Sequence, residues 1–199
     1  MEKPTIRVAA VGHPQHGKTT LAAALTTVLA KEYGGTARTA AEIQAGTRPL
    51  LGPVRASQVQ YQTTVQHVIH EDVAGGDADT AGAFGDSLTD GTPFNGLLLA
   101  VDAVQGLEPL SGVYIRSAHE AGLGAMVVAL TKADLVEDVE RLEVVELEIR
   151  ELMSSVGFLG DDIPVVRCAP EPALRGDEAA RQTILQLADA MADQFKSAG

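Results

Sequence analysis

The sequence predicts an α/β fold in which helices cover both faces of a mostly parallel sheet. Short apolar runs alternate with helical patterns along the chain, and a glycine-rich phosphate-loop pattern follows the first run. Hydrophobic residues make up 45% of the chain and aromatics only 4%, so the core is aliphatic, as parallel sheets favour. We therefore predict that residues 1–199 form one doubly wound domain with about six strands.

The first elements follow from composition and periodicity. Thr5–Val11 is a β-branched apolar run typical of a buried strand, and Lys18–Lys31 is rich in Ala and Leu, as expected of a helix. The stretch from Ala45 to Pro53 contains several Gly and Pro residues. We expect it to be an irregular loop with a functional role, because compact domains rarely carry long loops otherwise.

The remaining elements continue the alternation. Ser57–Gln62 and Thr64–Glu71 show the pattern of a hairpin, which adds one antiparallel strand, and the Gly- and Asp-rich segment Gly75–Gly91 is expected to be irregular and mobile. The same signals predict three further strands, Gly96–Val101, Ala125–Leu130 and Ile163–Val166, and three further helices, Pro109–Ala121, Asp138–Met153 and Asp177–Phe195.

A phosphate-binding loop is predicted between the first strand and the first helix. The segment from Gly12 to Thr19 fits G-x-x-x-x-G-K-[ST] in the structural context that this motif requires. Backbone N–H groups and the positive end of the helix converge on a β-phosphate in such a loop. The lysine reaches the β- and γ-oxygens, and the threonine hydroxyl ligates Mg²⁺. The alternative is a helix start without a ligand. The predicted phosphate site comprises Gly12, His13, Gln15, His16, Gly17, Lys18, Thr19 and Thr20.

A second motif indicates which nucleotide binds. Thr131-Lys132-Ala133-Asp134 follows a buried strand, at the sheet edge where α/β proteins bind ligands. An Asp here can accept hydrogen bonds from both N1–H and the exocyclic amine of guanine, a pair that adenine does not offer. The alternative is a helix-capping Asp beside a solvated Lys. The predicted guanine site comprises Thr131, Lys132 and Asp134, with Cys168 and Ala169 as the source of a backbone amide for the guanine oxygen.

Six segments together resemble the G domain of bacterial elongation factor Tu. They occur in the family's order and span most of the chain: GHPQHGKTTLAAALT, KEYGGTARTAAEI, YQTTVQHVIHEDVAGGDAD, NGLLLAVDAVQG, VVALTKADLVED and EIRELMSSVGFLGDDIPVVR. The resemblance implies a P-loop NTPase G-domain fold, a translational GTPase that binds GTP or GDP with Mg²⁺, and partners such as an exchange factor and the ribosome. Full-length members add two β-barrel domains. This sequence ends where the G domain ends, so ordinary delivery of aminoacyl-tRNA is not expected.

The second switch segment keeps part of the family pattern. Asp72-Val73-Ala74-Gly75 has the D-x-x-G frame, in which the resemblance implies that Asp72 holds a Mg²⁺-bound water and the Gly75 amide meets the γ-phosphate. The family follows this glycine with a His that orients the attacking water. Gly76 stands at that position and has no side chain, so we assign no catalytic residue.

The first switch and the phosphate loop also depart from the family. Gln15 replaces an Asp, and Arg48-Pro49-Leu50-Leu51 stands where the family has Arg-Gly-Ile-Thr, whose Thr ligates Mg²⁺. Leucine cannot coordinate a metal, and Thr47 is the nearest candidate substitute. His16 and His70 are further candidates to approach the nucleotide, although His16 matches the family's phosphate-loop His and His70 ends a predicted strand.

Charge and cysteine content exclude several classes of function. A net charge of −12 argues against nonspecific nucleic-acid binding, which needs a basic face. The only cysteine, Cys168, excludes an internal disulfide and a multi-thiolate metal site. No apolar run approaches the roughly 18 residues of a membrane span, and no signal-peptide pattern is present. We expect a cytoplasmic protein without a membrane partner.

The altered switches lead to a functional hypothesis. Losing the water-orienting His slows hydrolysis without abolishing binding, and losing a metal-binding Thr removes contacts that distinguish GTP from GDP. We expect a domain that binds both nucleotides with similar affinity, hydrolyses GTP slowly and switches poorly. One alternative is an interaction module or decoy that keeps the fold and the helix Asp138–Met153. Another is a P-loop enzyme that uses ATP, against which Asp134 argues.

Overall fold

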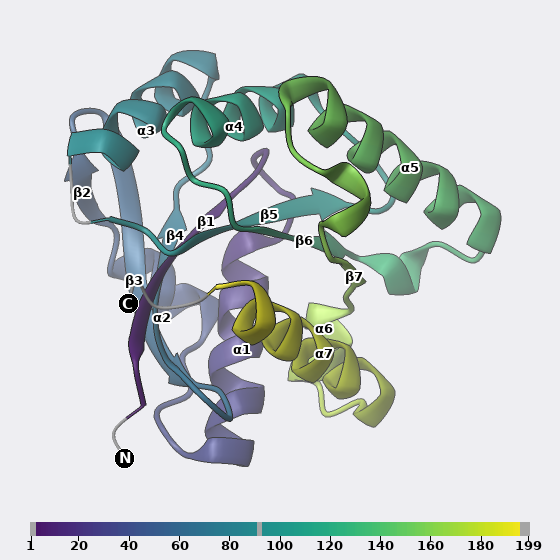
Figure 1. The fold of residues 1–199 in the computed structure, drawn as a ribbon. Helices are drawn as coiled ribbons and strands as arrows, with labels where there is room; N and C mark the ends of the chain where they lie inside the picture. The colour runs from purple at the N-terminus through teal and green to yellow at the C-terminus, as the bar shows by residue number, and fades with distance from the viewer. Residues whose placement is uncertain (1–2, 91–92, 196–199) are drawn as a thin grey trace.

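The structure, a computed structural model, describes residues 3–90 and 93–195 and contains a seven-stranded sheet (Figure 1). Its strand order is β2-β3-β4-β1-β5-β6-β7. Five neighbouring strands are parallel, β3 runs antiparallel to β4, and β2 runs antiparallel to β3. The strands are β1 Thr5–Val11, β2 Arg48–Leu51, β3 Val54–Gln62, β4 His67–Val73, β5 Gly96–Asp102, β6 Met126–Thr131 and β7 Val165–Arg167.

Helices cover both faces of this sheet, which confirms the predicted α/β fold. In Figure 1, α1, α6 and α7 lie on one face, and α3, α4 and α5 lie on the other. The helices are α1 Lys18–Tyr33, α2 Ala40–Ala45, α3 Ala78–Asp90, α4 Pro109–Glu120, α5 Val139–Val156, α6 Pro170–Leu174 and α7 Glu178–Gln194, with single 3₁₀ turns at Ala133–Leu135 and Gly160–Asp162.

Alternating side chains of the central strands build two apolar layers. Val8 and Ala10 of β1 pack toward α1, whereas Ala9 and Val11 pack toward the α3–α5 layer. Every residue of β5 is buried. A strand covered by helices on both sides needs apolar residues on both faces, which explains its continuous run GLLLAVD. The layers fix the carboxyl ends of β1, β4, β5 and β6 at one edge, where the predicted motifs lie. Within residues 3–90 and 93–195, no helix is long and apolar enough to cross a membrane.

Strand β2 adds a seventh strand where the sequence predicted an irregular loop. The guanidinium of Arg48 donates from Nη2 to both carboxylate oxygens of Glu71, each at 3.0 Å. Glu71 is fully buried and also accepts from Arg7 and Gln58. Leu50 packs against the apolar layer of α3 and α4. These long-range contacts, rather than local propensity, hold the segment in the sheet.

Residues 78–90 form helix α3. The prediction that Gly75–Gly91 is irregular is therefore wrong for these residues. The carboxylate of Asp77 accepts a hydrogen bond from the backbone N–H of Thr80 at 2.9 Å, which caps the first turn. Phe84 is fully buried, and Ala81 and Leu88 pack in the same apolar layer. Helical spacing of these three side chains outweighs the Gly and Asp content of the segment. Gly91 lies outside the described residues.

A buried histidine predicts a pH-dependent stability. His70 of β4 lies at hydrogen-bond distance from the Tyr61 hydroxyl (3.0 Å), and burial lowers its pKa from 6.5 to about 4. Between pH 6.5 and pH 4, His70 is protonated in the unfolded chain and neutral in the folded chain. The free energy of unfolding therefore falls as the pH falls from 6.5 toward 4. From pH 8 to pH 5 we expect this histidine to remove about 2 kcal/mol of unfolding free energy.

Urea unfolding of the wild type and of Tyr61→Phe/His70→Leu at both pH values checks this expectation. The double variant removes the titrating group and its hydrogen-bond partner together, so no polar atom of the pair is left unpaired. Its pH dependence should be smaller by the stated amount. Part of the pH dependence should remain in the double variant, because burial also lowers the pKa of His16. An identical pH dependence in both proteins contradicts the assignment.

Candidate functional site

The phosphate loop connects β1 to α1 in a conformation that specific glycines permit. The Gly12 backbone has φ +146°, and a Cβ there would lie 2.4 Å from the Ala100 carbonyl oxygen of β5. Gly17, immediately before α1, has φ +81°, and Gln15 adopts the left-handed region with φ 69°. The loop is therefore packed directly on β5, with its backbone turned around the start of α1.

Lys18 is buried within this loop. Its Nζ donates to the carbonyl oxygens of Gly12 and His13 at 2.8 and 2.9 Å. Burial lowers the pKa of Lys18 to about 8, although the nearby Asp72 carboxylate opposes this shift. A Cβ on Gly75 would lie 3.1 Å from the lysine Nζ and 3.1 Å from the Cα of Pro14. The D-x-x-G glycine thus lies against the phosphate loop, although the two segments are distant in the chain.

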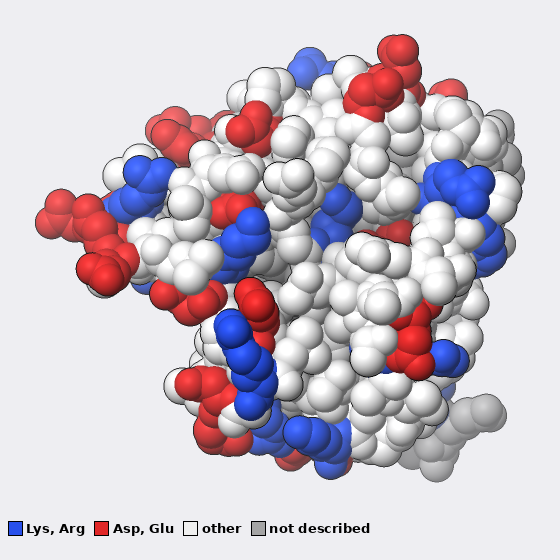
Figure 2. Space-filling model, turned by 180° about the vertical axis from the view of Figure 1, so that it is seen from behind, with Lys and Arg blue, Asp and Glu red and all other residues white. Residues whose placement is uncertain are grey.

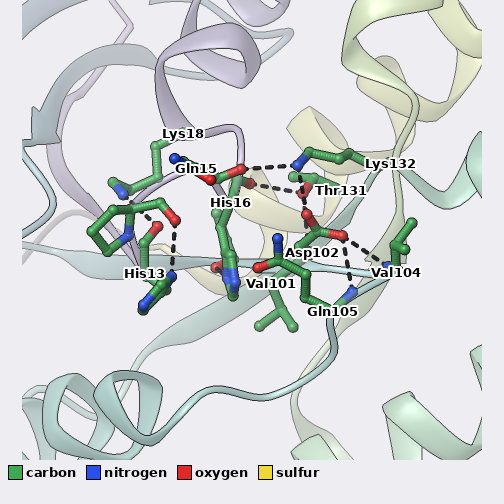
Figure 3. A network of polar contacts seen from close by, with 12 residues as sticks. His13, Gln15, His16, Lys18, Val101, Asp102, Val104, Gln105, Thr131 and Lys132 are labelled. Carbon is green, nitrogen blue, oxygen red and sulfur yellow. Dashed lines mark hydrogen bonds and ion pairs between the residues drawn. The ribbon is translucent and has the colours of Figure 1, made fainter.

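The motif at the end of β6 anchors the same loop (Figure 3). The Thr131 hydroxyl donates to the His16 carbonyl oxygen at 2.7 Å, so this side chain holds the loop rather than facing a base. Lys132 Nζ donates to the Gln15 carbonyl oxygen at 2.9 Å and pairs with the Asp102 carboxylate at 2.5 Å. These bonds tie β6 and β5 to the loop at its left-handed residue.

Asp102 belongs to this network and was not identified from the sequence. Burial opposes its ionisation, but hydrogen bonds from Lys132 and from the amides of Val104 and Gln105 outweigh burial and lower its pKa. Asp102 ends β5 directly beside Thr131 of β6. The sequence shows only that a polar residue ends a buried strand, and the role of Asp102 follows from its register beside Thr131.

Thr19 and Asp72 form the candidate magnesium site. The Thr19 hydroxyl donates to Asp72 Oδ2 at 2.7 Å. The other carboxylate oxygen, Oδ1, is buried and has no hydrogen-bond partner among the described residues, and burial raises the pKa of Asp72. No group of three or more His, Cys, Asp or Glu in the described chain could hold a metal by itself. The oxygen donors fit Mg²⁺ that takes most of its ligands from water and nucleotide phosphates.

Two adjoining cavities lie at this edge of the sheet. The larger, about 460 Å³, is lined by Lys18, Thr19, Asp72 and Gly75 among others. The smaller, about 80 Å³, is lined by Asp134 and Pro170 among others. Gly17, Thr20 and Lys132 line both. Lys132 thus lies between a cavity lined by Lys18, Thr19 and Asp72 and a cavity lined by Asp134.

Several predicted residues lie outside these cavities. The His16 side chain is fully buried beneath the loop, with Nδ1 3.3 Å from the Ala100 carbonyl oxygen, and His70 is buried against Tyr61. Cys168 and Ala169 follow strand β7. The Cys168 amide donates to Leu130 O at 2.8 Å and the Ala169 amide to Thr183 Oγ1 at 3.2 Å. Gly12 and His13 also line neither cavity, and His13 turns its Nδ1 toward Pro14 O at 2.8 Å.

The fold and the two cavities define a P-loop nucleotide-binding domain, with a phosphate loop after the first strand and a base-recognition motif two parallel strands further along. The family model for the elongation factor Tu GTP binding domain matches residues 3–197. The chain therefore belongs to the elongation factor Tu GTP-binding domain family, which makes it a guanine-nucleotide-binding domain of the translational GTPase type.

Proposed function

We propose that this domain binds GDP and GTP with Mg²⁺ and with similar affinity, and that it hydrolyses GTP slowly. One observation carries the proposal: Lys18, Thr19 and Asp72 share a cavity beside Asp134, whereas the residue after Gly75 has no side chain. The phosphate loop, Asp134 and the Gly75 amide would bind the nucleotide. Phosphoryl transfer depends on positioning the nucleophile, so a site without a water-orienting group retains binding and loses rate.

Strand β2 supports the proposal that the domain switches poorly. The first switch segment of the family changes its contacts with the γ-phosphate, but Arg48 is paired here with the buried Glu71, and Leu50 packs on the core. Moving the segment would leave part of the charge of Glu71 unpaired inside the protein, which is costly. A nucleotide shifts a conformational equilibrium only by its differential affinity for the two states. If the segment stays fixed in this way, GTP makes few contacts that GDP does not make, and the two affinities are similar.

Single-turnover hydrolysis of GTP tests the catalytic part of the proposal. We expect a rate at or below about 10⁻³ s⁻¹, the order of unstimulated GTPases. Lys18→Ala serves as the control for contaminating activity, because it removes the phosphate-binding ammonium group. A fast intrinsic rate that disappears in Lys18→Ala would refute slow hydrolysis.

Restoring the family histidine at Gly76 should not restore activity. A Cβ at this position would lie 2.6 Å from both Cβ and Oγ1 of Thr80, whose hydroxyl is bonded to Asp77 in the first turn of α3. We therefore expect Gly76→His to lower the unfolding free energy by about 1–3 kcal/mol and to leave hydrolysis within about twofold of the wild type. Thermal unfolding and single-turnover hydrolysis measure the two effects.

Gly82 provides the matched control in the same segment. It lies within α3, and a Cβ there meets nothing within 4 Å. Gly82→Ala should raise the unfolding free energy by up to about 1 kcal/mol, because alanine favours helix over glycine. A tenfold or larger gain in hydrolysis by Gly76→His would show that this position accepts a water-orienting side chain after all.

An interaction module is the second candidate function, favoured by one observation. Val144 and Leu147 of α5 are more than half exposed, at 53% and 57%. Exposed apolar side chains on a helix suit a protein partner, and an exchange factor or the ribosome is the partner class that we propose. Chromatographic identification of a co-purifying nucleotide separates the candidates. Guanine nucleotide supports the first function, its absence supports the module, and ATP points to a different P-loop enzyme.

The charge distribution supports the absence of nonspecific nucleic-acid binding. Figure 2 shows the face of the molecule opposite to the one seen in Figure 1. Basic and acidic side chains are interspersed on it, without a continuous basic surface. The net charge is −12. Binding to a phosphate backbone needs clustered Lys and Arg.

We also propose that residues 1–199 act as one domain and that the protein works in the cytoplasm.

A further inference from the structure

Two hydroxyl side chains line the larger cavity and have no role in the site described above. Ser57 lies in β3 directly opposite Asp72 of β4, so the two side chains lie on the same face of the sheet. Ser57 is only 3% exposed, and it lines the cavity together with Thr47 and Gln44. The Ser57 and Thr47 hydroxyl oxygens are 2.9 Å apart.

The hydrogen-bond donors of this pair can be assigned. The Thr47 hydroxyl donates to the Gln44 carbonyl oxygen at 2.7 Å, which uses its one proton. The bond between the two hydroxyls must therefore use the Ser57 proton, with Thr47 as acceptor. Ser57 Oγ is left with lone pairs and no proton to donate. In the cavity it can only accept a hydrogen bond or coordinate a cation.

Asp72 presents a matching acceptor next to Ser57. Its Oδ1 is buried without a partner among the described residues, and its Oδ2 accepts from the Thr19 hydroxyl. Lys18 directs its Nζ to two loop carbonyls. Thr19 of α1, Ser57 of β3 and Asp72 of β4 therefore line one cavity with oxygen-bearing side chains, and Ser57 Oγ and the buried Asp72 Oδ1 have unused acceptor capacity. Such a set is complementary to a hydrated divalent cation.

We propose that Ser57 supplies a hydroxyl oxygen to Mg²⁺ or to a water bound to it, and that Thr47 is the positioning residue that holds Ser57. This assignment rests on the proposed function. Ser57 would then take the place of the metal-binding Thr that the first switch segment lacks. Ser57 belongs to a strand paired with β4, so its oxygen is present whichever nucleotide is bound. The Mg²⁺ requirement should then be alike for GDP and GTP.

A Mg²⁺ titration of the complex with fluorescent GDP tests the proposal. The rate of GDP dissociation is measured at increasing Mg²⁺, beginning in EDTA, and gives the apparent Kd for Mg²⁺. Ser57→Ala should raise this Kd about tenfold and leave GDP binding in EDTA unchanged, as expected for one lost bond to a charged group. Thr47→Val should raise it about threefold, because Ser57 keeps its oxygen and loses its restraint.

Ser87→Ala is the matched control, because this buried α3 hydroxyl donates to Phe84 O and lies outside the cavity. It should leave the Kd for Mg²⁺ unchanged. Mn²⁺ bound per GDP complex, counted by electron paramagnetic resonance, provides an independent readout. If Ser57→Ala binds Mg²⁺ like the wild type, or weakens GDP equally in EDTA and in Mg²⁺, the inference on Ser57 is wrong and the proposed function stands. If the wild type does not bind GDP at all, both are overturned.

Discussion

Lys18→Ala is expected to weaken the binding of GDP and GTP by at least about a hundredfold. The lysine Nζ sits at the centre of the phosphate loop, 2.8 Å from the Gly12 carbonyl oxygen and close to the position where Gly75 meets Pro14. It is the cation of this loop that can reach the β- and γ-phosphates. Burial strengthens its attraction to phosphate because little water screens the charge. Titration with fluorescent GDP and GTP measures the loss.

Lys31→Ala provides the control for this lysine. Lys31 is exposed in the last turn of the same helix, far along α1 from the loop. Its replacement should leave nucleotide binding unchanged. Thermal unfolding of Lys18→Ala confirms that the loss is one of binding and not of folding. Nucleotide affinity retained within about threefold in a folded Lys18→Ala would mean that the phosphates bind elsewhere.

Asp134→Asn should change the base that the domain selects. A carboxylate accepts from N1–H and from the exocyclic amine of guanine, whereas a side-chain amide accepts only one bond and donates the other. Xanthine carries a carbonyl at the amine position and so matches the amide. A site built on paired hydrogen bonds rejects a mismatched ligand strongly. We expect GDP affinity to fall by about two orders of magnitude and xanthosine diphosphate to become the preferred ligand in competition titrations.

Glu171→Gln serves as the matched control for Asp134→Asn. Glu171 lines the same small cavity and carries the same charge. Removing that charge should leave the order of preference for GDP, xanthosine diphosphate and ADP unchanged. Equal weakening of GDP and xanthosine diphosphate by Asp134→Asn, or a change of preference caused by Glu171→Gln, would show that the base is recognised by other groups.

The parts of the fold that depend on local sequence could be predicted. β1, the phosphate loop and the start of α1 at Lys18 follow from an apolar run, a motif and a helical pattern that are contiguous in the chain. β2 and α3 could not, because they are held by distant partners: Arg48 by the buried Glu71, and Phe84 by the apolar layer of α4. Composition alone marked both segments as irregular.

The candidate site shows the same division. Lys18, Thr19, Asp72 and Asp134 could be located because each belongs to a motif, and all four line the two cavities. The role of Asp102 depends on its register beside Thr131, and that of Ser57 on its register beside Asp72. Strand register is set by packing of the whole sheet and is not visible in a local pattern.

The β7 end of the site could not be judged from sequence either. The backbone amide of Ala169, expected to face the guanine oxygen, donates to the Thr183 hydroxyl of α7. The amide of Cys168 donates to Leu130 of β6. Both bonds join segments that only the tertiary fold brings together. We therefore expect base recognition to depend most on Asp134 and on the Lys132 stem, which Asp102 and the Gln15 carbonyl hold in place.

Titration of nucleotide-stripped protein with fluorescent GDP and GTP, with and without Mg²⁺ and in competition with ATP, tests the central claim most directly. The proposed function predicts that both guanine nucleotides bind, with dissociation constants within about tenfold of each other, and that ATP does not displace them. Displacement by ATP, or a preference between GTP and GDP above about a hundredfold, would contradict it. So would the absence of binding at high micromolar protein concentration, which would direct attention to the interaction surface of α5.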